Sequence, residues 1–355
     1  MEPISHIAIR TDFAHHGAGG GYKQLLTFTK PKKIFGIKDW NNSRLSRLSP
    51  WRRYKWLHEF PAGWYARTRK IPLIHILYGE EYFRFSTHIP SDSKIVVTYH
   101  QPPDLLRREL EYGNKSGRLY GWTHRLTRER LKNVDAVIAI TPQQHSILAD
   151  YIPAERIHVI PLGCYSEEQS KRVKELGLAD STKQILTVGN WRRDWDLYIK
   201  LLSYCREHHP DWKFVLVNRN LSRELHSELI LHENFTYESD VNDERLFDLY
   251  RYSRVQFLPV LSAAGSNAFN ESLSYGLPVV TNMLFGEENE RRKKVVRVSD
   301  GNDLPVLAES IRQFLLLDVE DRAAIQSTAM RIAKEYDWGA IANRTEAIYR
   351  TLLNG

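Results

Sequence analysis

The sequence predicts an α/β protein built from two Rossmann-like domains. Its 355 residues suit two domains of ordinary size. Short runs rich in isoleucine and valine alternate with longer amphipathic stretches, a pattern typical of parallel strands connected by helices. The alternation stops at a polar stretch, residues 166–183, and then starts again. We therefore expect a second α/β unit after this boundary.

The expected strands are short apolar runs that end in polar residues, glycine or proline. In the first domain they span 6–11, 33–37, 74–79, 94–100, 135–141 and 157–163. In the second they span 185–190, 213–218, 255–260 and 278–282, with helices near 195–208 and 268–275. Ligands of such folds bind beyond the carboxyl ends of the strands. The loops after these runs are therefore where we look for a site.

The charge distribution and the cysteine content of the sequence indicate what kind of partners and which compartment to expect. Residues 1–165 carry 25 lysines and arginines against 14 acidic residues, a net charge of +11, whereas the remainder carries −4. Two domains with different partners are expected from this split. The two cysteines, Cys164 and Cys205, cannot form a disulfide framework, and the N-terminus does not resemble a secretory signal. We expect a cytoplasmic protein, with docking on the cytoplasmic face of a membrane as an open alternative.

The strongest chemical signal is the segment 257–280. It predicts a strand, a loop of small residues, a helix and a second strand. Gly265, Ser266 and Asn267 would place backbone N–H groups at the start of the helix, where a diphosphate is stabilised. Glu271, about one turn further on, could accept hydrogen bonds from a ribose. An ordinary strand–helix connection with a surface glutamate is the alternative.

This segment resembles the donor-site signature of retaining GT-B glycosyltransferases, family four in particular. The second half of that pattern is present as Glu271, Gly276 and the Pro278-Val279-Val280 run. The first glutamate of the pattern, which in the family contacts the transferred sugar, falls on Ala263. The resemblance implies a GT-B fold, in which two Rossmann-like α/β domains face a central cleft.

Other segments follow the same family in order along the chain. The run 94–103 resembles the strand that ends in a cleft histidine, which would be His100. The end of the chain resembles the helix that crosses back to the N-terminal domain. The resemblance implies an acceptor-binding domain over 1–165, a donor-binding domain over 166–336 and the crossing helix over 337–355.

The family holds the donor diphosphate with an arginine and a lysine that follow a Val-Gly pair. After Gly189 these two positions are Asn190 and Trp195. Arg192 and Arg193 lie in the same loop and could supply the charge instead, Arg193 slightly preferred. A solvated basic loop is the alternative. We expect a structural role for Asp194 and Asp196, although their spacing resembles a metal motif of another glycosyltransferase fold.

A glycine-rich turn follows the first strand. Gly19, Gly20 and Gly21 would let the backbone approach a ligand closely, although a tight turn alone would also need them. The loop is not a dinucleotide fingerprint, because its last glycine position is Tyr22. His15 and His16 have no matching ligand cluster, so we expect no metal site.

The segment 40–70 carries eight basic residues and one acidic residue, interleaved with four tryptophans. This composition suits an anionic membrane surface. The alternatives are an insertion that packs on its own domain and, less favoured, nucleic acid, for which no recognised motif is present.

Near the donor signature, Glu287, Glu288 and Glu290 form a charged run. We expect this run to be solvated apart from one acidic residue near the donor.

Taken together, these features predict a glycosyltransferase that moves a sugar from a nucleoside-diphosphate sugar to a saccharide or lipid-linked acceptor. By resemblance the reaction retains configuration and needs neither metal nor cofactor. We assign His100 and Glu271 to catalysis and the loops around Gly189 and Gly265 to the donor. Two alternatives stay open: a non-catalytic GT-B-like binding protein, suggested by Ala263 and Asn190, and an NAD(P)-dependent oxidoreductase.

Overall fold

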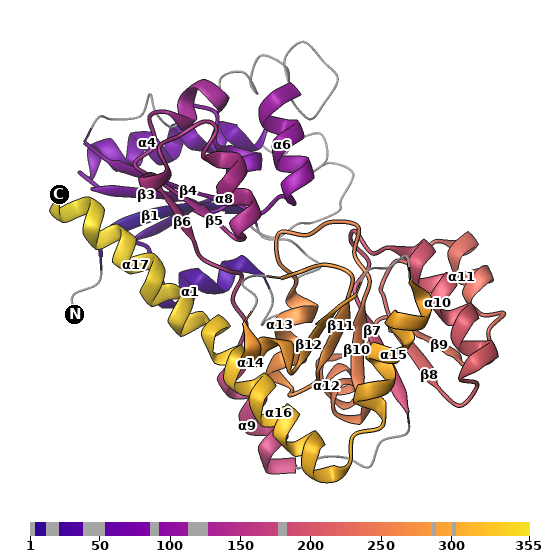
Figure 1. Ribbon diagram of the computed structural model, residues 1–355. Helices are drawn as coiled ribbons and strands as arrows, with labels where there is room; N and C mark the ends of the chain where they lie inside the picture. Colours follow the sequence, from indigo (N-terminus) through magenta and orange to yellow (C-terminus); the bar gives the residue numbers. More distant parts are fainter. Residues whose placement is uncertain are drawn as a thin grey trace. The chain divides into compact units, whose positions relative to one another are not determined.

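The structure, a computed structural model, describes residues 4–11, 21–37, 54–85, 92–112, 127–176, 183–285, 289–299 and 303–355. The chain forms two compact units. The N-terminal unit comprises Met1–Gly163 together with Trp338–Gly355, and the C-terminal unit comprises Cys164–Asp337. Each unit contains a six-stranded sheet in which all neighbouring strands are parallel (Figure 1). The prediction of two Rossmann-like α/β domains is confirmed.

The N-terminal unit has the strand order β2-β1-β3-β4-β5-β6. Its strands are β1 (His6–Thr11), β2 (Lys33–Ile37), β3 (Leu73–Ile76), β4 (Lys94–Tyr99), β5 (Ala136–Ala139) and β6 (Ile157–Val159). Its helices are η1 (Tyr22–Gln24), α1 (Leu25–Thr29), η2 (Lys55–His58), α4 (Glu59–Thr68), α5 (Gly79–Tyr82), α6 (Pro103–Tyr112), α8 (Pro142–Leu148), η4 (Ala154–Arg156) and α17 (Trp338–Asn354).

Helix α17, the last element of the chain, is held on the N-terminal sheet by buried polar contacts. The Tyr349 hydroxyl lies 2.5 Å from Nδ1 of His75 on β3. The other ring nitrogen of His75 lies 2.8 Å from the Thr98 hydroxyl on β4. Because all three side chains are buried, these hydrogen bonds fix the position of the helix on the sheet.

The C-terminal unit has the strand order β12-β11-β10-β7-β8-β9. Its strands are β7 (Gln184–Val188), β8 (Lys213–Val217), β9 (Phe235–Glu238), β10 (Val255–Leu258), β11 (Val279–Thr281) and β12 (Val296–Val298). Its helices are α9 (Ser166–Leu176), α10 (Trp195–His208), α11 (Arg223–Leu229), α12 (Asp243–Tyr252), α13 (Asn267–Ser274), α14 (Glu290–Lys293), α15 (Leu304–Leu315), α16 (Val319–Ala333) and η5 (Lys334–Tyr336).

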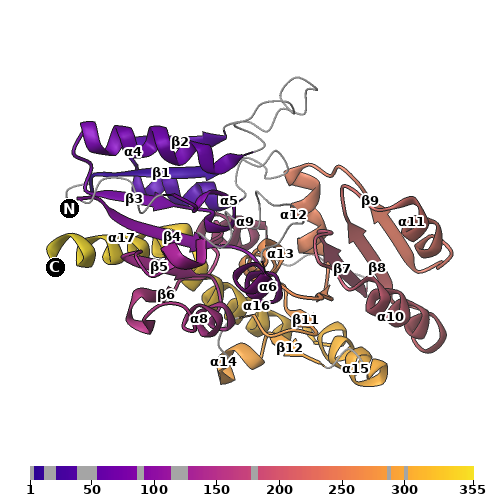
Figure 2. The ribbon, with the colours of Figure 1, turned by 90° about the horizontal axis from the view of Figure 1, so that it is seen from above.

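Alternate residues of the C-terminal strands enter different apolar clusters, because successive side chains of a strand point to opposite faces. Ile185 and Phe257 pack into the cluster that contains residues of α10 and α15. Leu186 and Leu258 enter clusters on the other face, with residues of α12 and α13. Figure 2 shows α12 and α13 on one side of this sheet and α10 on the other. Burial on both faces explains why these strands read as continuous apolar runs.

Strands β9 and β12 were not expected from the sequence. They are the two edge strands of the C-terminal sheet, and several of their residues are only partly buried. A strand with one neighbour and a half-exposed face lacks the apolar run by which the other strands are recognised. Within the described ranges, no helix combines the length and apolar character needed to cross a membrane.

Candidate active site

The candidate site on the C-terminal unit is formed by two loops at the carboxyl ends of the neighbouring strands β7 and β10. The Arg193 backbone makes an antiparallel bridge with Val260. The Leu261 N–H donates to the Arg192 carbonyl over 2.9 Å. Gly189 and Arg192 both have positive φ, 90° and 56°, which turns the first loop back onto the second. The two loops therefore form one backbone unit.

Arg193 is a buried cation. Its guanidinium Nη2 donates to the Val188 carbonyl over 2.7 Å, and Nη1 donates to the Trp191 carbonyl. Desolvation lowers its pKa to about 10, so it stays protonated at neutral pH. Across the residues that the structure describes, its hydrogen bonds go only to backbone carbonyls and not to a carboxylate. A buried charge without a counterion favours the binding of an anion.

Gly189 is required where the chain meets this guanidinium. A Cβ at this position would lie 3.0 Å from Nη2 of Arg193, and the φ of 90° also disfavours a side chain. Arg192 next to Arg193 is only partly buried, and Asn190 is exposed. The loop thus offers one fixed, buried arginine and a second arginine closer to solvent.

Trp195, Asp194 and Asp196, which follow Arg193, each contact another side chain or the backbone. Trp195 packs against the main apolar cluster, with its ring 6.0 Å from that of Tyr198. The Asp194 carboxylate accepts from the Leu197 N–H over 3.0 Å and caps α10. Asp196 pairs with Lys200 over 2.6 Å. Asp194 thus has a structural contact, as expected, and Asp196 lies in an exposed ion pair.

The second loop leads into α13. The Ser266 hydroxyl caps this helix by accepting from the Phe269 N–H, and Gly265 before it has a φ of 116°. Among the described residues, the Asn267 side chain at the first helical position has no hydrogen-bond partner. Ala263 is buried in an apolar cluster with Phe269. The loop therefore presents a helix start with no acidic residue in its first turn.

Glu271 lies in the second half of α13. Its carboxylate accepts from the Tyr250 hydroxyl over 3.2 Å. Desolvation raises the pKa of Glu271. Within the described part of the chain it has no cationic partner. Tyr250 also interacts electrostatically with Arg193, so it contacts the carboxylate and lies within electrostatic range of the buried cation.

His100 lies in the N-terminal unit, directly after β4. Its ring is held between two tyrosines, 4.4 Å from the Tyr22 ring and 4.6 Å from the Tyr78 ring. Tyr22 follows Gly21, whose φ of 81° begins the short helix η1. The structure thus brings His100 and one end of the glycine-rich turn together. Gly19 and Gly20 lie outside the described residues.

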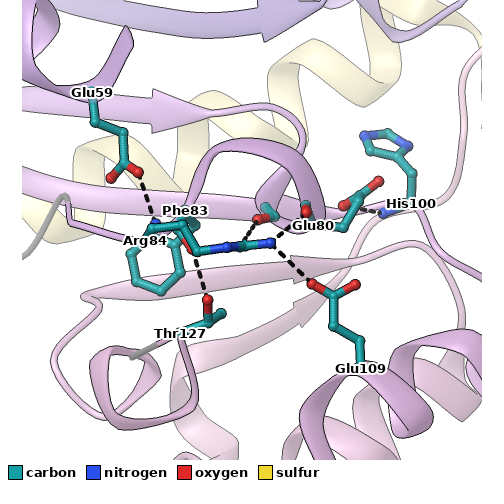
Figure 3. A network of polar contacts seen from close by, with 8 residues as sticks. Glu59, Glu80, Phe83, Arg84, His100, Glu109 and Thr127 are labelled. Atoms are coloured by element: carbon teal, nitrogen blue, oxygen red, sulfur yellow. Dashed lines mark hydrogen bonds and ion pairs between the residues drawn. The ribbon is translucent and has the colours of Figure 1, made fainter. Parts of the chain in front are cut away.

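A buried polar network lies beside His100, and sequence reasoning missed it (Figure 3). The His100 N–H donates to the Glu80 carboxylate over 3.3 Å. Arg84 donates to the Glu80 backbone carbonyl and, through the same nitrogen, to the Glu109 carboxylate. Desolvation and the nearby charges of Glu81 and Glu109 raise the pKa of Glu80 to about 8. An acidic residue directly after a buried strand was the available signal.

The charged run near the donor signature and the basic segment 40–70 are only partly covered by the described residues. Glu290 is exposed and pairs with Lys293 over 2.9 Å, as expected of a solvated charge run. Glu287 and Glu288 lie outside the described residues, as do residues 40–53 of the basic, tryptophan-rich segment.

The two halves of the chain match two models of one enzyme class. Residues 18–168 match the model described as Glycosyltransferase Family 4, and residues 182–316 match the model described as Glycosyl transferases group 1. The chain belongs to glycosyltransferase family four. This glycosyltransferase uses a nucleotide-sugar donor, and its family decides against both the oxidoreductase and the non-catalytic alternative. No curated protein matches the sequence.

Solved structures share the GT-B fold with this glycosyltransferase over its full length. Sucrose-phosphate synthase from Thermosynechococcus elongatus is 17% identical, with a TM-score of 0.70 and 99% of each chain covered. Anabaena HepE, solved with UDP and glucose, is 16% identical, with a TM-score of 0.64 and coverage of 98% of this chain and 100% of that chain. The catalytic domain of starch synthase IV from Arabidopsis thaliana, bound to ADP and acarbose, is 11% identical, with a TM-score of 0.66 and full coverage of both. The predicted GT-B fold and family are confirmed.

Proposed function

We propose that the two loops of the C-terminal unit bind the donor diphosphate, with Arg193 and Arg192 as its cationic partners. The observation that carries this proposal is Arg193, a buried cation hydrogen-bonded only to backbone carbonyls among the described residues, at the edge of the sheet where such folds bind ligands. The start of α13, with Gly265, Ser266 and Asn267, adds N–H donors of the polarity that a phosphate needs.

Glu271 is proposed to bind the ribose of the donor. A carboxylate without a cation can accept hydrogen bonds from a pair of hydroxyls, and Tyr250 already orients one of its oxygens. His100 is proposed, by resemblance to the family, to hold the transferred sugar. The tyrosines on either side of its ring fix the direction of that ring before a ligand arrives.

The reaction proposed is transfer with retention of configuration. The bond between the anomeric carbon and the diphosphate oxygen breaks, and the acceptor oxygen forms its bond on the same face of the sugar. The acceptor proton passes to the departing phosphate oxygen, so no protein side chain need act as nucleophile or base. Cationic groups stabilise the charge that develops on the diphosphate, which removes the need for a metal ion.

The acceptor is proposed to be a saccharide or a lipid-linked saccharide. A lipid-linked acceptor lies in a membrane, and the segment 40–70, with eight basic residues and four tryptophans, is suited to an anionic membrane surface. We also propose a cytoplasmic location, which agrees with the two cysteines of the sequence.

The donor assignment is tested by nucleotide binding. We expect at least one of UDP, GDP, ADP and TDP to raise the melting temperature of the protein. Replacing Arg193 by Met is expected to weaken that nucleotide about 10–100-fold in calorimetric titration, since hydrogen bonds to charged groups contribute roughly 1.5–3 kcal/mol. Glu271→Ala should weaken the nucleoside diphosphate but not inorganic pyrophosphate.

The matched control is Arg312→Met, because Arg312 is exposed and pairs with Glu309. It should bind nucleotide as the natural protein does. Absence of stabilisation by every nucleotide, or equal binding by the Arg193 and Arg312 variants, would remove the assignment.

A further inference from the structure

Helix α4 of the N-terminal unit exposes two large aromatic side chains on one face. Phe60 is 50% exposed and Trp64 is 70% exposed. Residues four positions apart lie on the same side of a helix, so the two rings are neighbours. The opposite side of α4 is buried through Ala62 and Ala66. Adjacent exposed aromatic rings on a well-packed helix indicate a surface that meets a partner.

The helix that presents these rings is anchored on its unit. The Tyr65 ring lies 5.7 Å from the Phe35 ring on the edge strand β2, and the Lys33 ammonium lies 4.8 Å from the Tyr65 ring. The Phe60 ring lies 5.6 Å from the Phe85 ring. Figure 2 shows α4 beside β2. The exposed rings therefore project from a fixed element.

The exposed charges of α4 and of the two residues after it have one sign. Arg67 follows Trp64 by one turn on the same face and is exposed, and Arg69 and Lys70 directly after the helix are exposed too. The acidic residue of α4 is Glu59, which is fully buried and accepts from the backbone N–H groups of Arg84 and Phe85. The outer side of the helix thus combines aromatic rings with positive charge and carries no exposed carboxylate of its own.

We infer that this face of α4, formed by Phe60, Trp64 and Arg67, docks on an anionic lipid surface. Aromatic rings of this kind lie at the level of the lipid headgroups, and arginine and lysine beside them meet the negative headgroups. The occupant follows from charge complementarity, since the N-terminal half of the sequence carries a net charge of +11. The inference rests on the proposed function only for the idea that the acceptor is lipid-linked, because docking does not depend on catalysis.

The experiment is flotation of the full-length protein with vesicles. One set contains equimolar phosphatidylcholine and phosphatidylglycerol, and the other contains phosphatidylcholine alone. We expect binding to the anionic vesicles and not to the neutral ones. The double variant Phe60→Ser, Trp64→Ser should lose about ten-fold or more of this binding, and Arg67→Gln should lose less.

The matched control is Leu231→Ser, since Leu231 is 74% exposed but belongs to the C-terminal unit. It should bind vesicles as the natural protein does. All four substituted positions are exposed, and circular dichroism and nucleotide binding should stay unchanged in every variant. Nucleotide binding also separates a failure of this inference from a failure of the donor assignment.

Three outcomes would overturn the inference. The natural protein could stay unbound at every concentration of anionic vesicles. The double variant could bind as tightly as the natural protein. A single-stranded oligonucleotide could bind more tightly than the vesicles and lose its affinity in the double variant, which would assign the face to nucleic acid.

Discussion

At the scale of single residues, the proposed diphosphate site differs from the family pattern in the position of its positive charge. The positions at which the family has arginine and lysine are Asn190, which is exposed, and Trp195, which packs into the core. The charge lies instead on Arg193, buried between them. Because a phosphate responds to the position of the positive charge and not to its place in the sequence, the proposal is that this loop binds the diphosphate with different residues.

Glu80 provides a prediction about pH. Its pKa in the folded protein is about 8, above the ordinary value of 4.5, so folding favours the protonated form. The contribution of protonated Glu80 to the free energy of unfolding is fully present below about pH 4.5, and it is lost as the pH rises through about 8. Glu80→Gln keeps an oxygen for the His100 N–H but cannot ionise. Above pH 8 we expect this variant to be more stable than the natural protein. The expected gain is on the order of 2 kcal/mol, less than the full pKa shift implies, because Glu80 is only partly buried and solvent screens its charge.

The measurement is urea unfolding of both proteins between pH 5 and 9. The difference in stability should grow with pH and level off above about pH 8. Glu290→Gln is the control, because the pKa of exposed Glu290 is lowered by Lys293 and it is therefore ionised throughout this range. A difference between Glu80→Gln and the natural protein that stays constant with pH would contradict the assignment.

At the scale of secondary-structure elements, the position of α17 depends on a close approach of the chain. A Cβ on Gly163 would lie 2.4 Å from Cε3 of Trp338, the buried first residue of the helix. Trp338 also packs edge-on against Tyr22, with ring centroids 5.7 Å apart. Only glycine at position 163 lets the indole occupy this place.

Replacing Gly163 by Ala should therefore destabilise the N-terminal unit. Overpacking of this kind typically costs about 1–3 kcal/mol, because either the indole or the backbone must shift. Chemical denaturation followed by tryptophan fluorescence measures the loss. Gly355→Ala is the control, since a Cβ there would make only an ordinary contact at 3.5 Å. A Gly163→Ala protein as stable as the control variant would show that α17 tolerates displacement.

The elements also show where sequence patterns succeed and fail. All ten expected strands are present, because each reads as an apolar run, including the edge strands β2 and β6, which are only partly buried. The expected helices around 195–208 and 268–275 correspond to α10 and α13. The edge strands β9 and β12 were not predicted, because polar residues interrupt their short apolar runs. The helix capped by Asp194 and the strands at 6–11 and 33–37 have the predicted bounds, and the helix capped by Ser266 begins and ends one residue earlier than expected.

At the scale of the whole molecule, the donor assignments fall within one unit. Gly189, Arg193, Ser266 and Glu271 all belong to Cys164–Asp337, whose half of the sequence is net acidic. The positive surplus belongs to the other half, where the acceptor is proposed to bind. The local positive charge of a diphosphate site therefore does not depend on the net charge of its domain.

Amide hydrogen exchange should detect the nucleotide in the two loops of the C-terminal unit. A nucleoside diphosphate at about 100 times its dissociation constant stabilises the bound state by roughly 2.7 kcal/mol. We expect slower exchange in peptides that cover 186–195 and 262–272, by up to about 100-fold for amides that exchange through local opening. Peptides from β9 and α11 should change little. Protection confined to α11, or absent from both loops, would place the nucleotide elsewhere.

The sequence by itself determined the class of fold and the family, and it supplied the segments proposed to bind the donor, because these depend on local patterns: apolar runs, small-residue loops and the spacing of a few polar residues. Tertiary structure decided which groups act together. Only the packed chain buries Arg193 against backbone carbonyls, brings Tyr250 to Glu271, and surrounds Glu80 with the charges that raise its pKa. These properties depend on desolvation and on distances between residues remote in sequence, which no local pattern contains.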